Sequence, residues 1–239
     1  MVRLLHIYLP RLQVFYFDLL NSSFMFINVH THHPVGSGIE IENWDIRNPD
    51  FCPTATYYSA GIHPWWIEEV DVVGKIKCLK NILNQSNCLA IGEVGMDKFA
   101  TAELKLQQNI FKWQLELANE FHKPVILHVV RSHQEIVDIF HQKKCNIPFI
   151  FHGFNGNMSI ATTLVKEDFY FSLGGALLNK QSNAAVLLKT MDLKYLFFEN
   201  DDLSSPIENI YYAASEILNV KIDDICAIVE ENFEKVFHK

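Results

Sequence analysis

Short apolar stretches alternate with longer segments of helical periodicity along most of the chain. The apolar stretches cover residues 26–32, 39–44, 54–60, 89–91, 124–128, 149–153, 169–173 and 195–201. Apolar residues recur at helical spacing over residues 70–85, 102–120, 132–141, 159–166, 183–189, 207–218 and 222–237. Strands that are apolar throughout and alternate with helices are typical of a parallel sheet covered on both faces. The pattern therefore predicts an α/β fold, a TIM-type barrel in one domain spanning residues 26–239.

Two segments carry more detailed expectations. The helix predicted over residues 102–120 has its clearest apolar stripe at Leu106, Ile110, Trp113, Leu117 and Phe121. No segment of helical period separates His33 from the strand predicted over residues 39–44. We therefore expect the barrel to be distorted or shortened in its first βα unit.

Charge and cysteine content bear on the binding partners and on the cellular compartment. The net charge of −8 argues against a uniformly basic surface for duplex DNA. The five cysteines form no CxxC pair, which predicts reduced thiols and a cytoplasmic protein. Residues 1–25 are apolar but interrupted by Arg3, Pro10 and Asp18, which makes them too broken for a membrane span. We expect them to be an N-terminal extension, with Met25 as the true start, and no membrane partner.

Polar side chains stand at the ends of most predicted strands, where α/β barrels carry their chemistry. His30 and His32 alternate along the first strand and so share one face. The other strand ends bring His63, Glu93, His128, His152 and Asp201. Each residue alone could cap a strand, a turn or a helix. Together they indicate a metal centre, because histidine and carboxylate ligands without thiolates suit Zn, Mn, Fe or Mg.

The number of candidate ligands bears on the number of ions. Six are too many for a single catalytic ion that keeps an open position, and they suit two ions acting together. They are His30, His32, Glu93, His128, His152 and Asp201.

The sequence also resembles a known family. Motifs in the family's order are NVHTHH, SAGIHPWW, AIGEVGMD, a run from Gln107 to Arg131, FHGF, FSLGG and FFENDD. They are similar to those of the TatD metal-dependent deoxyribonucleases, within the amidohydrolase superfamily, over roughly residues 26–239. The ending from Glu231 to Phe237 is also similar to that of the family.

The resemblance implies two divalent ions (Mg, Mn or Zn), with Glu93 bridging them. One ion would be held by His30, His32, Glu93 and Asp201, and the other by Glu93, His128 and His152. A water would attack the phosphodiester, with Asp201 orienting it and taking its proton. The implied substrate is single-stranded or nicked DNA, cut exonucleolytically by a monomer.

Substrate contacts are the least specific part of this prediction. Arg131 is placed to hold a phosphate, and its alternative is a surface salt bridge. His63 could contact the leaving phosphate, and its alternative is a structural GIHP turn. Trp65 and Trp66 could stack on bases, and core packing is their alternative.

The chain departs from the family pattern in three places. Asn28 stands where an aspartate is usual, and Asn200 stands where a threonine is usual. The segment between His32 and Gly61 is shorter than the family norm, which puts a complete barrel wall on that side in doubt.

Two other functions compete with the nuclease. The same metal site could hydrolyse a small ester, lactone, amide or aminoacyl ester, because one scaffold supports many substrates. A retained, non-enzymatic binding module is the third reading, and the intact set of candidate ligands argues against it.

Overall fold

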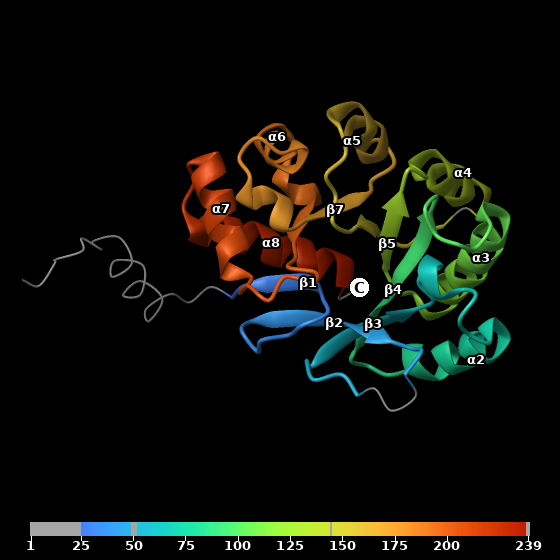
Figure 1. The fold of residues 1–239 in the computed structure, drawn as a ribbon. Coiled ribbons are helices and arrows are strands. Elements are labelled where there is room, and N and C mark those ends of the chain that lie inside the picture. The colour runs from blue at the N-terminus through green and yellow to red at the C-terminus, as the bar shows by residue number, and fades with distance from the viewer. Residues whose placement is uncertain (1–24, 49–51, 144, 238–239) are drawn as a thin grey trace, which may run out of the picture.

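The computed structural model describes residues 25–48, 52–143 and 145–237. Within them, eight strands form one sheet in which each strand pairs in parallel with the next along the chain. The strands are β1 (Ile27–Thr31), β2 (Ile39–Asp45), β3 (Tyr57–Gly61), β4 (Cys88–Asp97), β5 (Val125–Val130), β6 (Phe149–Phe151), β7 (Tyr170–Leu173) and β8 (Leu196–Phe198). A parallel bridge between Thr31 and Asp201 joins the last strand end to the first. The predicted TIM-type barrel is confirmed (Figure 1).

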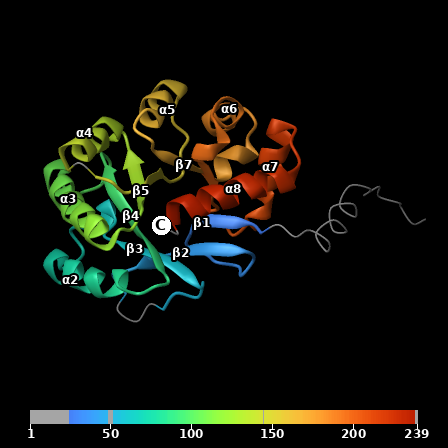
Figure 2. The same cartoon turned by 180° about the vertical axis from the view of Figure 1, so that it is seen from behind.

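Helices surround this sheet, as Figure 1 shows from one side and Figure 2 from behind. They are α2 (Val72–Leu83), α3 (Leu104–Phe121), α4 (His133–Lys143), α5 (Met158–Val165), α6 (Asn183–Thr190), α7 (Glu208–Leu218) and α8 (Ile222–Phe237). Short 3-10 turns are η1 (Pro64–Trp66), η2 (Gly175–Leu178) and η3 (Leu193–Tyr195). Strand β4 runs on through Asp97, well beyond the apolar stretch that predicted it, because Val94 to Asp97 continue to pair with β5. Strand β8 is shorter than predicted, since Tyr195 belongs to η3.

The buried face of α3 differs from the predicted stripe. Leu106 and Trp113 are 42% and 46% exposed, so the prediction was wrong for these two residues. The helix instead buries a face that includes two glutamines: Gln107, Ile110, Phe111, Gln114, Leu115, Leu117 and Ala118. A polar residue can occupy such a face when its amide oxygen and nitrogen are both hydrogen-bonded, and both glutamines meet that condition.

The first βα unit lacks its helix, as predicted, yet the strand layer is complete on that side. The chain returns from β1 to β2 through residues 32–38, without a helix. The buried carboxylate of Glu40 accepts hydrogen bonds from the backbone N–H groups of Val35 (3.1 Å) and Gly36 (2.7 Å). Gly38 has a φ of +75°, and a Cβ there would lie 2.1 Å from the carbonyl oxygen of Phe26. A glycine is therefore required where the loop meets β1.

The loop on the other side of β2 is held in the same way. Glu42, also buried, accepts hydrogen bonds from the backbone N–H groups of Thr54 and Ala55. Glu40 and Glu42 are two residues apart and so point to the same face of β2. Ile41 and Asn43 point to the opposite face, toward the barrel interior.

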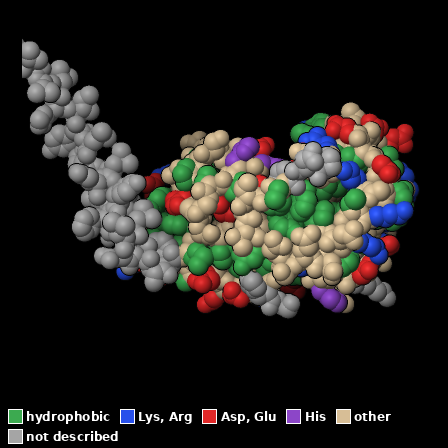
Figure 3. Space-filling model, turned by 90° about the horizontal axis from the view of Figure 1, so that it is seen from below, with side chains coloured by type: hydrophobic (Ala, Val, Ile, Leu, Met, Phe, Trp, Pro, Cys, Tyr) green, Lys and Arg blue, Asp and Glu red, His purple; other side chains and the backbone are tan. Residues whose placement is uncertain are grey.

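The surface has no dominant charge on the face shown in Figure 3, where acidic, basic and hydrophobic side chains are interspersed. No helix among the described residues combines the length and the apolar character that a membrane crossing requires. The predicted extension over residues 1–24 lies outside the described part of the chain.

Candidate metal centre

The carboxylate of Glu93 lies at the centre of the histidines predicted as ligands. Its Oε1 atom is 2.7 Å from Nδ1 of His128 and 2.7 Å from Nε2 of His152. Its Oε2 atom is 3.5 Å from Nε2 of His30 and 3.7 Å from Nε2 of His32. One carboxylate on β4 therefore faces side chains from β1, β5 and the residue after β6. Such a position is the one that a ligand shared by two ions needs.

Asp201 completes the cluster from the end of β8. Its Oδ1 atom is 3.4 Å from Nε2 of His30 and 3.6 Å from Nε2 of His32. The backbone of Asp201 has a φ of +51° and is held by two hydrogen bonds. The N–H of His32 donates to the carbonyl oxygen of Asp201, and the N–H of Asp201 donates to that of His30. The six predicted ligands are thus brought together in one cluster.

Charges in the cluster are strongly coupled. Burial opposes protonation of His30, but the carboxylates of Asp201 and Glu93 outweigh it and raise the pKa of His30 to about 9. The pKa of His152 is likewise raised, against burial, by Glu93 and Glu199. Burial favours the neutral form of Glu93, but the neighbouring His152, His128 and His30 hold its pKa well below the usual range. The carboxylates are therefore ionised, and the site favours positive charge between them.

The donor set fits divalent metal ions. His30 is fully buried, and neither ring nitrogen makes a hydrogen bond, although Nε2 faces the carboxylates of Asp201 and Glu93 at 3.4 and 3.5 Å. A buried imidazole without hydrogen bonds is costly unless a charge or an ion binds it. Ligand atoms lie within 4.8 Å of one another in the groups His30–His32–Asp201, His30–Glu93–His152 and His63–Glu93–His128. Nitrogen and oxygen donors without thiolates suit Zn, Mn or Mg.

Two further carboxylates, which the sequence analysis missed, orient two of these histidines. Asp97 is fully buried, and its Oδ2 atom is 3.1 Å from Nε2 of His128. Glu199 is also buried, and its Oε1 atom is 3.3 Å from Nδ1 of His152. Each imidazole therefore lies between Glu93 and a second carboxylate, the arrangement that fixes the ring orientation of metal-binding histidines. The signal was present, because both acids belong to quoted motifs, AIGEVGMD and FFENDD.

Buried amides hold the strand ends in place. Gln107 of α3 bonds the backbone N–H and C=O of Asp97, and Gln114 bonds those of Ile62. Asn43 of β2 accepts a hydrogen bond of 2.9 Å from the backbone N–H of Glu93. These contacts fix the backbone that carries the site, and no periodicity of apolar residues could reveal them.

The two unusual asparagines contact each other. Nδ2 of Asn28 donates to Oδ1 of Asn200 at 2.7 Å, and the backbone N–H of Asn200 donates to Oδ1 of Asn28. Both side chains are fully buried beneath the site. The two departures from the family pattern therefore form one satisfied pair that ties β1 to the residue preceding Asp201.

His63 lies against the candidate metal centre, where one ring nitrogen caps η1 and the other faces Glu93. Its Nδ1 atom accepts a hydrogen bond from the backbone N–H of Trp65, which caps η1, and its Nε2 atom is 3.4 Å from Oε1 of Glu93. Burial lowers the pKa of His63, so the ring is neutral at pH 7. Since Nδ1 accepts, the proton is on Nε2, and His63 presents a donor to the centre rather than a free lone pair.

Arg131 and the tryptophans lie farther out. Arg131 follows β5 with a φ of +56°, and its guanidinium lies 4.7 Å from the ring centroid of Phe99. Among the described residues, no carboxylate lies within ion-pair distance of it, so the salt-bridge alternative does not hold there. Trp65 is 54% exposed, and its Nε1 donates to Asp97 at 2.6 Å. Trp66 packs under the guanidinium of Arg47.

Comparison with known proteins assigns the chain to a family. The family model for TatD-related DNases matches residues 50–238. The chain belongs to this family. An uncharacterized metal-dependent hydrolase of Methanocaldococcus jannaschii is 34% identical over 75% of this chain and 70% of its own length. One from Mycoplasma genitalium is 27% identical over 90% of both chains.

Solved structures agree on the fold of this TatD-family chain. YjjV, a TatD homologue from Escherichia coli, superposes with a TM-score of 0.77 at 21% identity, over 90% of this chain and 98% of that one. A TatD-family hydrolase from Entamoeba histolytica gives a TM-score of 0.71 at 14% identity, again over 90% and 98%. These structures show a TatD-type barrel, and the family match makes the chain a metal-dependent hydrolase.

Proposed function

We propose that this TatD-family hydrolase is a deoxyribonuclease that removes nucleotides from single-stranded DNA and requires two divalent ions. The observation that carries the proposal is the position of Glu93, whose two oxygens face histidines on opposite sides. The family model's own description, a DNase, supports the substrate class.

The two ligand sets are those expected from the family, and they are supported by Glu93, whose Oε2 faces His30 and His32 and whose Oε1 faces His128 and His152. One ion would be held by His30, His32, Glu93 and Asp201, and the other by Glu93, His128 and His152. When bound, the ions supply positive charge for an anionic phosphodiester and lower the pKa of a bound water.

The chain's own residues then have distinct tasks. The side chain of Asp201 is 40% exposed, against 5% for Glu93, so Asp201 is the carboxylate that solvent and substrate can reach. Its Oδ1 atom faces His30 and His32, which leaves Oδ2 to orient the attacking water and accept its proton. Nε2–H of His63 is a donor that can stabilise negative charge on the leaving phosphate.

Arg131 supports an anionic substrate. The described residues include one other arginine, Arg47, and the carboxylates of Asp45 and Glu69 already pair with it. Arg131 retains an unpaired charge three residues beyond His128, where a phosphate next to the scissile bond would lie. A small neutral ester or lactone carries no negative charge that Arg131 could bind. The net charge of −8 and the mixed charges on the face shown in Figure 3 also favour a single strand over a duplex lying along the protein.

Degradation of end-labelled single-stranded DNA tests the proposal. We expect Mg²⁺- or Mn²⁺-dependent shortening that EDTA abolishes. Glu93→Ala should lower the rate by at least about 100-fold, because Glu93 faces both ligand sets. Glu216→Ala, which removes an exposed carboxylate paired with Lys180, should retain wild-type activity. Metal-loaded protein that leaves DNA intact but cleaves a small ester or amide would refute the nuclease and establish the alternative hydrolase.

A further inference from the structure

A cavity of about 590 Å³ opens between α4 and α5, outside the metal centre. Its volume falls within the range of roughly 300–1,000 Å³ that small-ligand sites occupy. The two helices that line it follow the strand ends bearing His128 and His152. Arg131, which lines the cavity, directly follows β5, so one end of the cavity lies at the rim of the barrel, three residues along the chain from His128.

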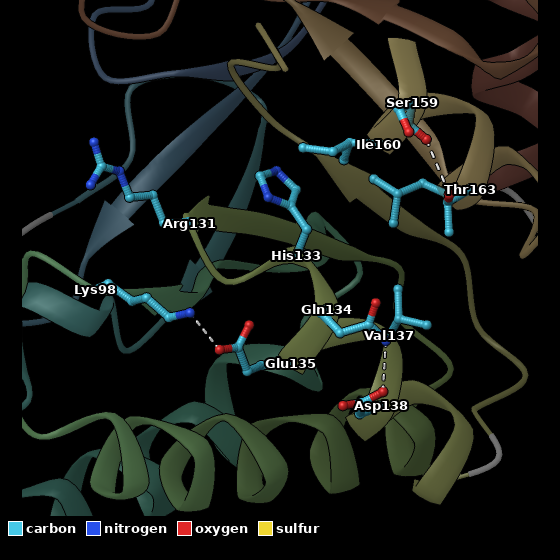
Figure 4. Close-up of a pocket in the computed structure, with 11 residues that line it drawn as sticks. Lys98, Arg131, His133, Gln134, Glu135, Val137, Asp138, Ser159, Ile160 and Thr163 are labelled. Atoms are coloured by element: carbon cyan, nitrogen blue, oxygen red, sulfur yellow. Dashed lines mark hydrogen bonds and ion pairs between the residues drawn. The ribbon is translucent and has the colours of Figure 1, made fainter. Parts of the chain in front are cut away.

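Figure 4 shows how its walls differ. Arg131 and Lys98 lie on one side, Ile160 and Thr163 lie on the other, and His133 stands between them. Lys98 pairs with Glu135 at 2.6 Å, so its charge is compensated within the wall. Arg131 is the uncompensated cation at the mouth.

The interior suits a flat, partly polar group. The ring of His133 stacks on Phe151, with centroids 5.8 Å apart, and burial lowers the pKa of His133 so that its ring is neutral. A neutral imidazole offers one donor and one acceptor. Gln134 and Asp138 bond each other and add amide and carboxylate atoms, while Ile160 contributes apolar surface. Planar bases with hydrogen-bonding edges are recognised by surfaces of this kind.

The backbone at Arg131 is consistent with a functional position. Five described residues other than glycine have positive φ: His122, Arg131, Asp168, Asp201 and Asn219. His122 and Asn219 are helix C-caps, where the left-handed conformation is ordinary. Asp168 lies in the turn after α5, whereas Arg131 follows a strand end, as Asp201 does, a place where backbone strain can accompany function.

We infer that this cavity is a nucleotide subsite: it receives one unpaired base of the DNA strand, while Arg131 holds the phosphate that connects this base to the scissile bond. The inference rests on the proposed nuclease function and names where that substrate lies. A base that is paired in a duplex cannot enter the cavity, so the subsite also accounts for a single-strand preference.

Neighbouring threonines on α5 provide a matched pair of variants. Thr163 lines the cavity, whereas Thr162 lies on another face of the helix. Both are exposed, and both donate to a backbone carbonyl one turn earlier at 3.0 and 2.8 Å. Thr163→Phe fills the cavity, and Thr162→Phe places the same ring outside it. Ser159→Phe is a second way to fill the cavity from the first turn of α5.

The test measures binding and cleavage separately. Binding uses a fluorescent single-stranded oligonucleotide with phosphorothioate linkages, which keeps the charge and resists hydrolysis. Thr163→Phe and Ser159→Phe should each raise the Kd by at least about tenfold, the scale of one lost base contact. Thr162→Phe should stay within about twofold of wild type. Cleavage of bis(4-nitrophenyl) phosphate, which has no base, should be equal in all four proteins.

Two outcomes overturn the subsite. Equal Kd values for the Thr163 and Thr162 variants would show that no base enters the cavity. Slower cleavage of the small diester by the Thr163 variant would show that the substitution acts on the metal centre instead. Failure of the nuclease proposal looks different, because then wild-type protein with metal leaves DNA intact, while the binding comparison still decides the subsite.

Discussion

At the scale of single residues, the centre depends on side chains that hold its candidate ligands as well as on the ligands. Asp97 bonds His128, and Glu199 bonds both His152 and the backbone N–H of Gly153. Both acids are buried, so they act in a region of low dielectric, where orientation is enforced strongly. We therefore expect substitutions of Asp97 or Glu199 to alter metal binding, although every candidate ligand is still present.

Asp97→Asn tests this dependence. The amide preserves the volume but removes the charge that faces Nε2 of His128, so metal affinity should fall by about 10- to 100-fold. Titration against a competing chelator measures the change. Trp65→Phe is the control, because it removes the other side chain that contacts Oδ2 of Asp97 and leaves His128 its partner. Equal affinities for Asp97→Asn and wild type would contradict an orienting role.

The candidate ligands were predictable because each stands at a strand end in a recognisable motif, and six side chains of metal-binding type on successive strand ends are hard to explain otherwise. Asp97 and Glu199 were not singled out, since an acid in a motif has many explanations until its neighbours are known. The exact role of His63 also needed the structure, because its tautomer is set by the N–H of Trp65.

At the scale of elements, β2 shows how a barrel can dispense with a covering helix. The loops before and after it pack against its outer face, and their backbone N–H groups are satisfied by Glu40 and Glu42. Alternating glutamates on a strand usually indicate a face exposed to water. The strand was therefore predictable, but the burial of its acidic face was not.

Glu40→Ala should destabilise the fold by about 1–3 kcal/mol, because it leaves the N–H groups of Val35 and Gly36 without their acceptor. Urea unfolding measures the loss. Glu231→Ala, on the exposed side of α8, should change stability by no more than about 0.5 kcal/mol. A Glu40 variant as stable as the Glu231 variant would show that water satisfies the loop equally well.

Helix α3 shows that the position of a helix can be predicted while its buried face is not. Its existence and length were predictable from a strong helical period, while its orientation was misjudged at Leu106 and Trp113. The rotation places Gln107 and Gln114 inward, where each amide replaces a backbone partner at a strand end. Counting apolar residues cannot anticipate such a polar contact.

At the scale of the whole molecule, the proposed metal ions and protons would compete for the same atoms. Without metal, the carboxylates of Glu93 and Asp201 keep His30 protonated up to a pH of about 9. An ion must displace this proton, so metal binding is expected to release at least about one proton at pH 7. Affinity should rise at least about tenfold per pH unit between roughly 6.5 and 9.

Calorimetric titration of metal in buffers of different ionisation enthalpy measures this release. The stability of the metal-free protein has the opposite pH dependence. Because the folded-state pKa of His30 is raised, its protonation stabilises the fold fully below a pH of about 6.5, and this contribution is lost toward about 9. A metal-binding heat that does not depend on the buffer would contradict the exchange of proton for metal.

The joint between β8 and β1 includes one bridge, Thr31 to Asp201, the backbone bonds around it and the Asn28–Asn200 pair. His30 and His32 stand on one side of this joint, and Asp201 stands on the other. An ion held by all three would therefore also link the first and last strands of the barrel. Removing it should first increase amide hydrogen exchange at the neighbouring backbone N–H groups of His32 and Asp201. Catalytic activity and the pairing that closes the barrel would then be lost at the same place.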